Sequence, residues 1–312
     1  MQKIRIKVLM VTLGAFAMFA GLMNAAIAAA PNARIVVAKS GGNYTTITAA
    51  LNAIVPSATK PYTIEVWPGT YAENVTMKSY VHLKGLGRGV TYLKPASGNA
   101  ITMTSLTNVA VSGLSIILTP GTYGIYPSRT VNAEIVDCDI SNGAIGVYAV
   151  TGSSVVITGN TFNANQYFGL GIESSTAVIT NNVITGNGII GQYYGAVDLF
   201  DTRAGTIVAG NVIRGNNNNG ITVHHAVPST ISNNTITDNL GYGLNIQSNA
   251  FVGIVNTNNI VNNGGTTYTD IFVADGAIPG PTLNLNIYDD ITGTRGVGGG
   301  NYTSAGGPAP AP

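Results

Sequence analysis

The sequence predicts an all-β fold: a single-stranded right-handed parallel β-helix, a solenoid of roughly 22–24 residues per turn, with an N-terminal capping α-helix. The first observation behind this prediction is a repeat of the pattern Asn-x-apolar-x-x-Asn, and the second is that each repeat contains three short apolar stretches. Three strands in about 22 residues leave no space for a crossover helix or for the four strands of a propeller blade. The five copies start at Asn160, Asn182, Asn211, Asn234 and Asn258.

The first asparagine of each copy continues a column that begins with Leu114 and Cys138 earlier in the chain. Successive members of this column are 24, 22, 22, 29, 23 and 24 residues apart. A coil in which each turn stacks on the previous one gives parallel sheets whose strands lie about 4.8 Å apart. The right-handed sense follows from the general chirality of parallel strand connections.

We interpret these asparagines as structural residues rather than catalytic ones. An asparagine at a sharp corner tolerates the left-handed backbone conformation, and its amide can bond nearby backbone groups. Asparagines stacked at the same corner of successive turns can also bond one another as a ladder. Strict recurrence is therefore expected at a corner of the coil.

Residues 1–28 have the order of a secretory signal peptide. Three basic residues precede an apolar run from Val8 to Met23, and a segment of small residues follows that run. We expect cleavage after Ala28, and the alternative is an uncleaved membrane anchor, since the apolar run is long. The predicted location is therefore secreted, periplasmic or at the cell surface.

The β-helix domain is predicted to span residues 31–295, and residues 296–312 form a Gly/Pro/Ala-rich tail that we expect to be flexible. The segment Thr46–Ile54 carries apolar residues at helical spacing. Because it precedes the first turn, we expect it to cover the open N-terminal end of the coil. The strands expected around this helix are Arg34–Ala38, Tyr62–Trp67, Val81–Leu83 and Thr91–Leu93.

The composition excludes several classes of protein. Only 9% of the residues are charged, which argues against a disordered chain. The net charge is +1, or near −2 without the three basic residues of the leader, so we expect no nucleic-acid partner. The single cysteine, Cys138, rules out an intrachain disulfide and the multi-cysteine type of zinc site.

Two segments after the leader carry a family resemblance. The first runs from Ile35 through Tyr44-Thr45-Thr46-Ile47 to Ile54, and the second runs from Tyr62 through Trp67-Pro68-Gly69-Thr70-Tyr71 to Val75. With the following Val81–Gly87, these residues resemble the N-terminal part of pectin methylesterases, which are members of the pectin-lyase-like right-handed β-helix superfamily. The resemblance implies this fold, and it is shared too widely within the superfamily to imply one reaction.

The catalytic motifs of the related families are not matched. The Gln-Ala-Val, Asp-Phe-Ile-Phe-Gly and Gly-Arg-Pro-Trp segments of pectin methylesterases are absent, and no aspartate precedes Asp137. The signature segments of polygalacturonases and of pectate lyases are absent as well. The resemblance therefore assigns no catalytic residue in this chain.

Outward side chains at the same place on successive third strands are expected to form columns about 4.8 Å apart. We align these strands on the glycines that precede them, which are Gly124, Gly146, Gly169, Gly195, Gly220 and Gly243. One predicted column consists of Tyr148, Gly171, Asp198, Thr222 and Asn245. The column two residues further on consists of Val150, Glu173, Phe200, His224 and Gln247.

The 29-residue step from Asn182 to Asn211 inserts extra chain beside these columns. We expect it to bring Asp201 and Arg203 close to both columns. Neighbouring carboxylates can act as an acid/base pair in glycoside cleavage, and their oxygens also suit a calcium ion, Ca²⁺. The candidate catalytic residues are Glu173, Asp198, Asp201 and Arg203.

The alternative interpretation of this patch is an exposed polar face with an incidental contact between Asp201 and Arg203, which would add little stability. The adjacent His224 and His225 point to opposite faces if they lie in a strand, so a two-histidine metal site is not expected. We predict no required cofactor, and Ca²⁺ is the one ion considered.

A further column of largely aromatic residues lies just before the glycines, at Tyr123, Ile145, Phe168, Tyr194, Asn219 and Tyr242. Aromatic faces suit sugar rings, and stacked aromatic side chains also stabilise a parallel coil. The candidate substrate-binding residues are Tyr148, Phe168, Tyr194, Phe200, Thr222, His224, Tyr242, Asn245 and Gln247.

Three functional hypotheses follow from the sequence. The first is an exported β-helix protein that binds, and in one version processes, a polysaccharide or cell-surface glycan along its exposed sheet face. The second is a divergent polysaccharide lyase, glycoside hydrolase or pectinesterase-like enzyme. The third is a structural, adhesin-like rod at the cell surface that catalyses nothing. No membrane contact is expected after the leader is removed.

Overall fold

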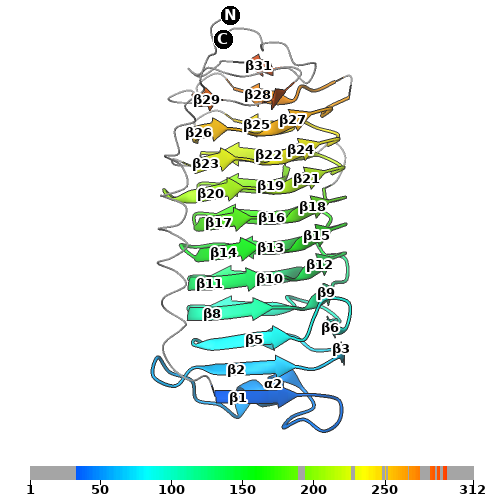
Figure 1. Ribbon diagram of the computed structural model, residues 1–312, viewed down its shortest axis with the longest axis vertical. Helices are drawn as coiled ribbons and strands as arrows, with labels where there is room; N and C mark the ends of the chain where they lie inside the picture. Colours follow the sequence, from blue (N-terminus) through cyan, green and yellow to red (C-terminus); the bar gives the residue numbers. More distant parts are fainter. Residues whose placement is uncertain are drawn as a thin grey trace, which may run out of the picture.

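The computed structural model describes residues 33–188, 194–225, 229–247, 250, 252–265, 267–274, 282–284, 287–288 and 291–293. These residues form a solenoid of parallel strands, with β1 (Ala33–Val37) at one end of the stack and β31 (Ile291–Gly293) at the other (Figure 1). The predicted parallel β-helix is confirmed. The predicted leader, residues 1–28, and the predicted tail, residues 296–312, lie outside the described residues.

The turns of the coil contribute strands to three sheets. Sheet 1 holds the strands that precede the repeated asparagines, sheet 2 the strands that follow them, and sheet 3 the third strand of each turn. Sheet 1 consists of β1, β2 (Tyr62–Val66), β5 (Val81–Gly85), β8 (Thr107–Ser112), β11 (Val131–Val136), β14 (Ser154–Thr158), β17 (Thr176–Thr180), β20 (Thr206–Ala209), β23 (Ser229–Ser232), β26 (Val252–Asn256) and β29 (Thr282–Asn284). Sheet 2 consists of β3 (Gly69–Tyr71), β6 (Thr91–Leu93), β9 (Ser115–Ile117), β12 (Asp139–Ser141), β15 (Thr161–Asn163), β18 (Val183–Thr185), β21 (Val212–Arg214), β24 (Thr235–Thr237), β27 (Asn259–Val261) and β30 (Ile287–Tyr288). Sheet 3 consists of β4 (Val75–Thr76), β7 (Ile101–Thr104), β10 (Tyr123–Ser128), β13 (Ile145–Ala149), β16 (Phe168–Glu173), β19 (Gly195–Phe200), β22 (Asn219–His224), β25 (Leu244–Ile246), β28 (Ile271–Val273) and β31.

The helix α2 (Ile47–Asn52) lies beside β1 and covers the N-terminal end of the stack, as predicted (Figure 1). It buries Ile47 and Leu51 toward the coil, so its apolar side replaces the missing preceding turn. The Thr46 hydroxyl accepts the N–H of Ala49, and the Glu73 carboxylate accepts the N–H groups of residues 47 and 48 at 2.9 Å each. The backbone N–H groups of the first helical turn therefore have hydrogen-bond acceptors, although the helix is short.

Stacked apolar side chains fill the inside of the coil. In sheet 2 the central inward residue of each turn pairs in register with its equivalent in the next turn. These residues have no solvent exposure, and they are Ile116, Ile140, Phe162, Ile184, Ile213, Ile236 and Ile260. The core is thus a repeated contact between like side chains, which holds successive turns in one register.

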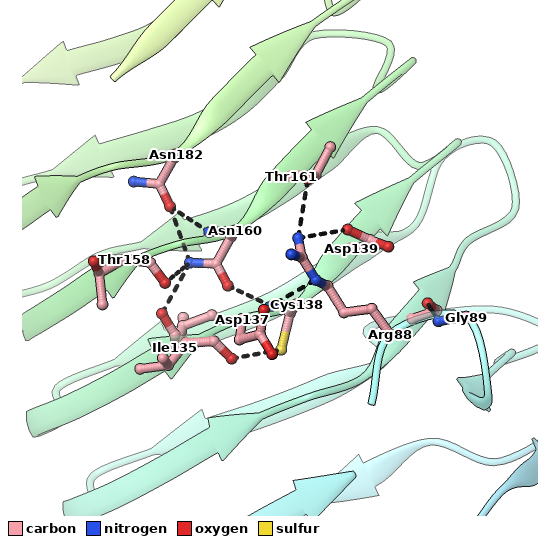
Figure 2. A network of polar contacts seen from close by, with 12 residues as sticks. Arg88, Gly89, Ile135, Asp137, Cys138, Asp139, Thr158, Asn160, Thr161 and Asn182 are labelled. Carbon is pink, nitrogen blue, oxygen red and sulfur yellow. Dashed lines mark hydrogen bonds and ion pairs between the residues drawn. The ribbon is translucent and has the colours of Figure 1, made fainter. Parts of the chain in front are cut away.

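Two buried asparagine ladders run beside this core. In the first, Asn182 Oδ1 accepts the backbone N–H and the Nδ2 of Asn160 at 2.9 and 3.0 Å (Figure 2). Asn182 Nδ2 in turn donates to the Ile157 carbonyl oxygen at 2.9 Å and to Asn211 Oδ1 at 3.0 Å. Each amide therefore bridges its neighbours on both sides, and its hydrogen-bonding capacity is used inside the protein.

The second ladder is formed by the last asparagine of each repeat. Its members are Asn165, Asn187, Asn216, Asn239 and Asn263. It ends at the buried carboxylate of Asp270, whose Oδ1 accepts the backbone N–H and the Nδ2 of Asn263 at 2.9 and 3.0 Å. An acidic side chain thus occupies the next position of the ladder.

The expectation that the ladder asparagines themselves adopt the left-handed conformation is wrong. Positive φ is found one residue earlier, for example at Asp137 (52°), Asn181 (56°) and Asn233 (56°), and at the glycines Gly159 and Gly210. The ladder asparagine must aim its own N–H at the next amide while its side chain points inward. The corner bend is therefore made by the residue before it.

The alignment of the third strands on glycines is correct except in the longest turn. A Cβ added to Gly146 would lie 2.5 Å from the carbonyl oxygen of Gly169, so the close approach of successive turns requires glycine there. Leu170 pairs with Val197, which places Ala196 opposite Gly169 and moves Gly195 one residue ahead of the glycine position. The extra chain before β19 relieves the close approach at this turn.

The loop between β5 and β6 contacts two later turns through Arg88. Its guanidinium lies 3.0 Å from Asp137 Oδ1 and 3.2 Å from Asp139 Oδ1, and it donates to Thr161 Oγ1 at 3.2 Å (Figure 2). All three partners belong to the corner and strands of sheet 2, away from sheet 3. This partly exposed network links turns that are distant in sequence and contributes modestly to stability.

We predict that Asn182→Ala lowers the free energy of unfolding by at least about 3 kcal/mol, because it removes the buried side chain that accepts the Asn160 backbone N–H and donates to the Ile157 carbonyl oxygen and to Asn211 Oδ1. Equilibrium urea unfolding of the intact chain measures this change. Asn163→Ala, at an exposed asparagine of β15, is the matched control and should change stability by less than about 0.5 kcal/mol. Equal losses in both variants would contradict a structural role for the ladder.

Candidate functional site

The outward side chains of sheet 3 form a continuous face, and its register agrees with the predicted columns. Tyr148 pairs with Gly171, Gly171 with Asp198, Asp198 with Thr222, and Thr222 with Asn245. In the second column Glu173 pairs with Phe200 and Phe200 with His224, and the Gln247 N–H donates to Val223 and so continues the ladder beside His224. We call this surface the sheet 3 face.

An aromatic cluster covers the part of the sheet 3 face nearer the N-terminal end, and we call it the first aromatic cluster. The ring centroid of Tyr148 lies 5.7 Å from Tyr123, 6.0 Å from Tyr126 and 6.5 Å from Phe168. Phe168 in turn lies 5.4 Å from Tyr194 in an edge-to-face contact. Tyr194 is 42% exposed, so it presents its ring to solvent.

Tyr194 reaches this cluster from outside the column in which it was predicted. The register places Gly195, rather than Tyr194, opposite Asn219. Asn219 is followed in the column by Tyr242, because Ile221 pairs with Leu244. The ring of Tyr194 therefore joins Phe168 from the corner that precedes β19.

The hydroxyl of Tyr148 donates a short hydrogen bond to the Glu173 carboxylate on the next strand. Burial of the ring, followed by this bond to Glu173, raises the pKa of Tyr148 above its usual value. The phenol is therefore held as a proton donor, and the Glu173 carboxylate is fixed over the face.

The carboxylate of Asp198 is 6% exposed although it points outward. Its Oδ2 accepts the N–H of Gly195 at 3.1 Å and lies 3.4 Å from His224 Nε2. This contact follows the same diagonal as the Tyr148–Glu173 bond, from one column to the next column on the following strand. Four successive strands of sheet 3, β13 to β22, thus supply two parallel polar pairs.

Beyond Asp198 the column continues with two further buried polar side chains. We call the three residues, Asp198, Thr222 and Asn245, the polar row. Thr222 Oγ1 accepts Asn219 Nδ2 at 3.0 Å. Asn245 is 2% exposed, and its Oδ1 has no hydrogen-bond partner. A buried acceptor without a partner is costly, so this position is suited to receive a hydroxyl from a ligand or water.

A second aromatic cluster bounds the polar row on the other side. Tyr242 stacks on Phe272 with ring centroids 4.9 Å apart and an angle of 24° between the planes, and it meets Tyr268 edge to face at 4.9 Å. Phe272 pairs with Asn245 in the sheet. From β16 to β25 there are three strand steps, so the two aromatic clusters are separated by about 14 Å.

Two of the candidate catalytic residues, Asp201 and Arg203, do not contact the carboxylates beside which they were expected. Asp201 is exposed in the corner after β19, where its Oδ1 lies 4.0 Å from His225 Nδ1. The Arg203 guanidinium lies over Gly152, since a Cβ added there would be 3.2 Å from Nη1 and Nη2. Among the described residues neither side chain forms a hydrogen bond or ion pair with Glu173 or Asp198, which lie in the two outward columns on adjacent strands.

Within the part of the chain that the structure describes, no group of three or more His, Cys, Asp or Glu residues could hold a metal ion. The Ca²⁺ proposed from the sequence therefore has no set of three such ligands there. One oxygen of each carboxylate accepts a hydrogen bond within the protein: Glu173 Oε2 from Tyr148 and Asp198 Oδ2 from Gly195.

A histidine–serine pair on the outer face of sheet 1 was not identified from the sequence. His82 Nε2 lies 2.7 Å from Ser112 Oγ, on the next strand of that sheet. Burial, and then the nearby Lys84 charge, lowers the pKa of His82 to about 4. In the register His82 pairs with Ala110, so the contact with Ser112 is a diagonal one, two residues beyond the paired position. This turn precedes the asparagine repeat and its length differs from the regular period, so the sequence pattern offered no signal for the pair.

Comparison with known proteins identifies the family. The family model described as right handed beta helix region matches residues 123–305, more than half of the chain. A pectinesterase of Aspergillus aculeatus is 31% identical over 118 residues, which cover 36% of this chain and 33% of that enzyme. The chain thus spans about a third of the length of this curated relative. These matches confirm the pectin-lyase-like superfamily predicted from the N-terminal segments.

Solved structures show the same fold at low sequence identity. The A-module of mannuronan C-5 epimerase AlgE4 of Azotobacter vinelandii is 16% identical with a TM-score of 0.55, covering 84% of this chain and 87% of that module. An alginate lyase of Paenibacillus sp. is 17% identical with a TM-score of 0.55, covering 88% of this chain and 96% of that enzyme. At these identities the likeness concerns the fold alone.

We predict that His82 makes the protein less stable as the pH falls from about 6.5 to about 4. In this window the unfolded chain binds a proton on His82 while the folded chain does not, so the unfolded state is favoured. His82→Gln should remove about 2–3 kcal/mol of the stability loss between pH 7 and pH 4.5, measured by urea unfolding. Ser112→Ala, which keeps the buried imidazole, should retain the pH dependence, and an unchanged slope in His82→Gln would refute the prediction.

Proposed function

The chain belongs to the family of right-handed β-helix proteins, and from this premise we propose that it binds a polysaccharide along the sheet 3 face. The observation that carries the proposal is the arrangement of two aromatic clusters on either side of the buried polar row. Aromatic rings offer apolar faces to sugar rings, and the polar groups between them fix orientation.

The chemistry of the polar row supports a hydroxyl-rich ligand. Asn245 Oδ1 is a buried acceptor without a partner. The Asp198 carboxylate accepts from Gly195 of its own strand, and the Glu173 carboxylate accepts from Tyr148 of the preceding strand. Sugar hydroxyls are donors that fit such acceptors. The about 14 Å between the aromatic clusters allows several sugar units to lie across the strands at once.

The similar proteins support the ligand class. They are enzymes named for mannuronan, alginate and pectin. All of these are polysaccharides, and the fold is shared over most of this chain in two of the three cases. We carry over the class of ligand and no particular sugar.

A second candidate function is cleavage or modification of the bound polysaccharide. The two diagonal pairs favour it, since Tyr148–Glu173 and Asp198–His224 place a potential proton donor and acceptor on adjacent strands. General acid–base catalysis needs such groups within hydrogen-bonding reach of the reacting atoms. In this hypothesis Glu173 and Asp198 act on the sugar, while Asp201 and Arg203 take no part in the reaction.

We infer that the protein is exported by its leader and meets the polysaccharide outside the cytoplasm. The basis is the order of charge, apolar run and small residues in residues 1–28. In the described part of the chain, no helix is long and apolar enough to cross a membrane.

We predict that Tyr194→Ala weakens binding of a polysaccharide about tenfold, because it removes an exposed ring from the first aromatic cluster. Affinity gel electrophoresis against a panel of soluble glycans measures the change. Tyr92→Ala, on sheet 2, is the matched control and should bind as the unchanged protein does. If no glycan of a broad panel is retarded, polysaccharide binding is excluded and the structural rod becomes the better hypothesis.

If a reducing-sugar or unsaturated-product assay detects turnover, we predict that Asp198→Asn lowers kcat by about 10²–10⁴-fold while binding persists. The asparagine can still accept the Gly195 N–H but cannot act as a base. Asp201→Asn is the matched control, because Asp201 lies in the corner beyond the face, and its activity should remain within about twofold. Equal activity of Asp198→Asn and the unchanged protein would remove Asp198 from the reaction.

A further inference from the structure

We propose that the polysaccharide bound on the sheet 3 face is a neutral one, without a carboxylate on its sugars. This inference rests on the proposed function and adds the charge class of the ligand. It follows from the position of every basic residue in the repeat region, together with the acidic groups on the face.

No strand of sheet 3 contains a lysine or an arginine. From residue 130 to residue 294 the sequence has no lysine and only two arginines, Arg203 and Arg214. This stretch includes every loop beside the polar row and the second aromatic cluster.

These two arginines and the nearest earlier one point away from the polar row. The Arg203 guanidinium covers Gly152 in the corner after β13, and Arg214 is an exposed residue of sheet 2. Arg129 follows β10, and its Nε donates to Ser105 Oγ at 3.1 Å. None of the three contacts the Asp198 or Glu173 carboxylate within ion-pair distance among the described residues.

The other basic residues in the described part of the chain lie near the N-terminal end or on other sheets. Arg34 pairs with Glu65 on sheet 1, Lys84 also belongs to sheet 1, and Arg88 pairs with acidic residues of sheet 2. The remaining lysines are Lys39 over Tyr71, Lys60 over Tyr62, Lys94 over Tyr92, and Lys78 bonded to the Ile54 carbonyl oxygen.

The face therefore carries two carboxylates and no lysine or arginine to pair with an acidic ligand. Its one basic side chain, His224, already lies 3.4 Å from Asp198 Oδ2. A uronate polymer brings one carboxylate per sugar, and proteins recognise carboxylates mainly through arginine, often with two parallel hydrogen bonds. Here such a polymer would meet the carboxylates of Glu173 and Asp198 instead. The carboxylates of the polymer and of the protein repel each other at contact distance. A neutral sugar can instead donate hydrogen bonds from its hydroxyls to the same oxygens.

The experiment compares matched polymers that differ only in charge. Homogalacturonan with nearly complete methyl esterification and the same preparation after saponification form one pair, and β-1,4-mannan and β-1,4-mannuronan oligosaccharides form another. Neutral xylan, galactan and glucan complete the panel. Affinities are measured for the intact protein by calorimetry or affinity electrophoresis in EDTA, at low and at high NaCl, and again with added Ca²⁺.

The proposal expects at least one neutral glycan to bind, and the acidic member of its pair to bind about tenfold more weakly or not at all at low salt. The difference in affinity between the neutral and the acidic polymer should become smaller as NaCl screens the repulsion. Equal or tighter binding of the acidic polymer, with or without Ca²⁺, overturns the inference and leaves the proposed function standing. Absence of binding across the panel removes both.

A variant provides an independent readout of the same repulsion. Glu173→Gln should raise the affinity for the acidic polymer about fivefold, since it removes one negative charge from the face. Asp238→Asn is the matched control, because Asp238 is an exposed residue of another corner, and it should leave this affinity unchanged. An acidic polymer that binds Glu173→Gln no better than the unchanged protein contradicts the proposal.

Discussion

The turn-to-turn register is the constraint on which the rest of this structure depends, and two buried asparagine ladders hold it. Each ladder amide, such as Asn182, bonds the turn before and the turn after, and so exchanges hydrogen bonds to water for an internal chain of them. The same register stacks apolar core side chains on one another, and it places outward side chains of successive strands about 4.8 Å apart. The strands of each turn pair only with those of the neighbouring turns, so this local agreement must repeat along the whole length of the solenoid.

Because the ladders keep the asparagines in register, extra chain must be accommodated at the corners. Thirteen residues separate Ile184 from Val197, against eight from Phe162 to Leu170 in the preceding turn, so five of the seven extra residues lie before β19. The remaining two lie after it, at the corner that holds Asp201. The inserted residues therefore lie on both sides of β19, the strand that carries Asp198. Gly195, whose N–H donates to the Asp198 carboxylate, is the first residue of this strand.

The candidate site could be predicted from the sequence as far as periodicity reaches. The columns through Asp198 and Glu173 follow from the repeat, since strands of equal phase place equal positions side by side. Tyr194 and Gly195 were assigned one position out of register because the inserted chain moved the glycine used for alignment. Arg203 was expected beside the carboxylates and instead covers Gly152, because the direction of a long side chain in a corner depends on which neighbouring turn leaves space.

The sequence by itself determined the fold of this protein, its capping helix, its asparagine ladder and the columns through Asp198 and Glu173. The ladder and these columns follow from the repeat, and the helix follows from the helical spacing of its apolar residues. Only the tertiary structure decided which members of the columns contact each other. The diagonal bond from Tyr148 to Glu173, the burial of Asp198 and the unpaired Asn245 oxygen depend on the size and reach of the side chains on adjacent strands. Periodicity specifies which residues are neighbours, and packing specifies how those neighbours meet.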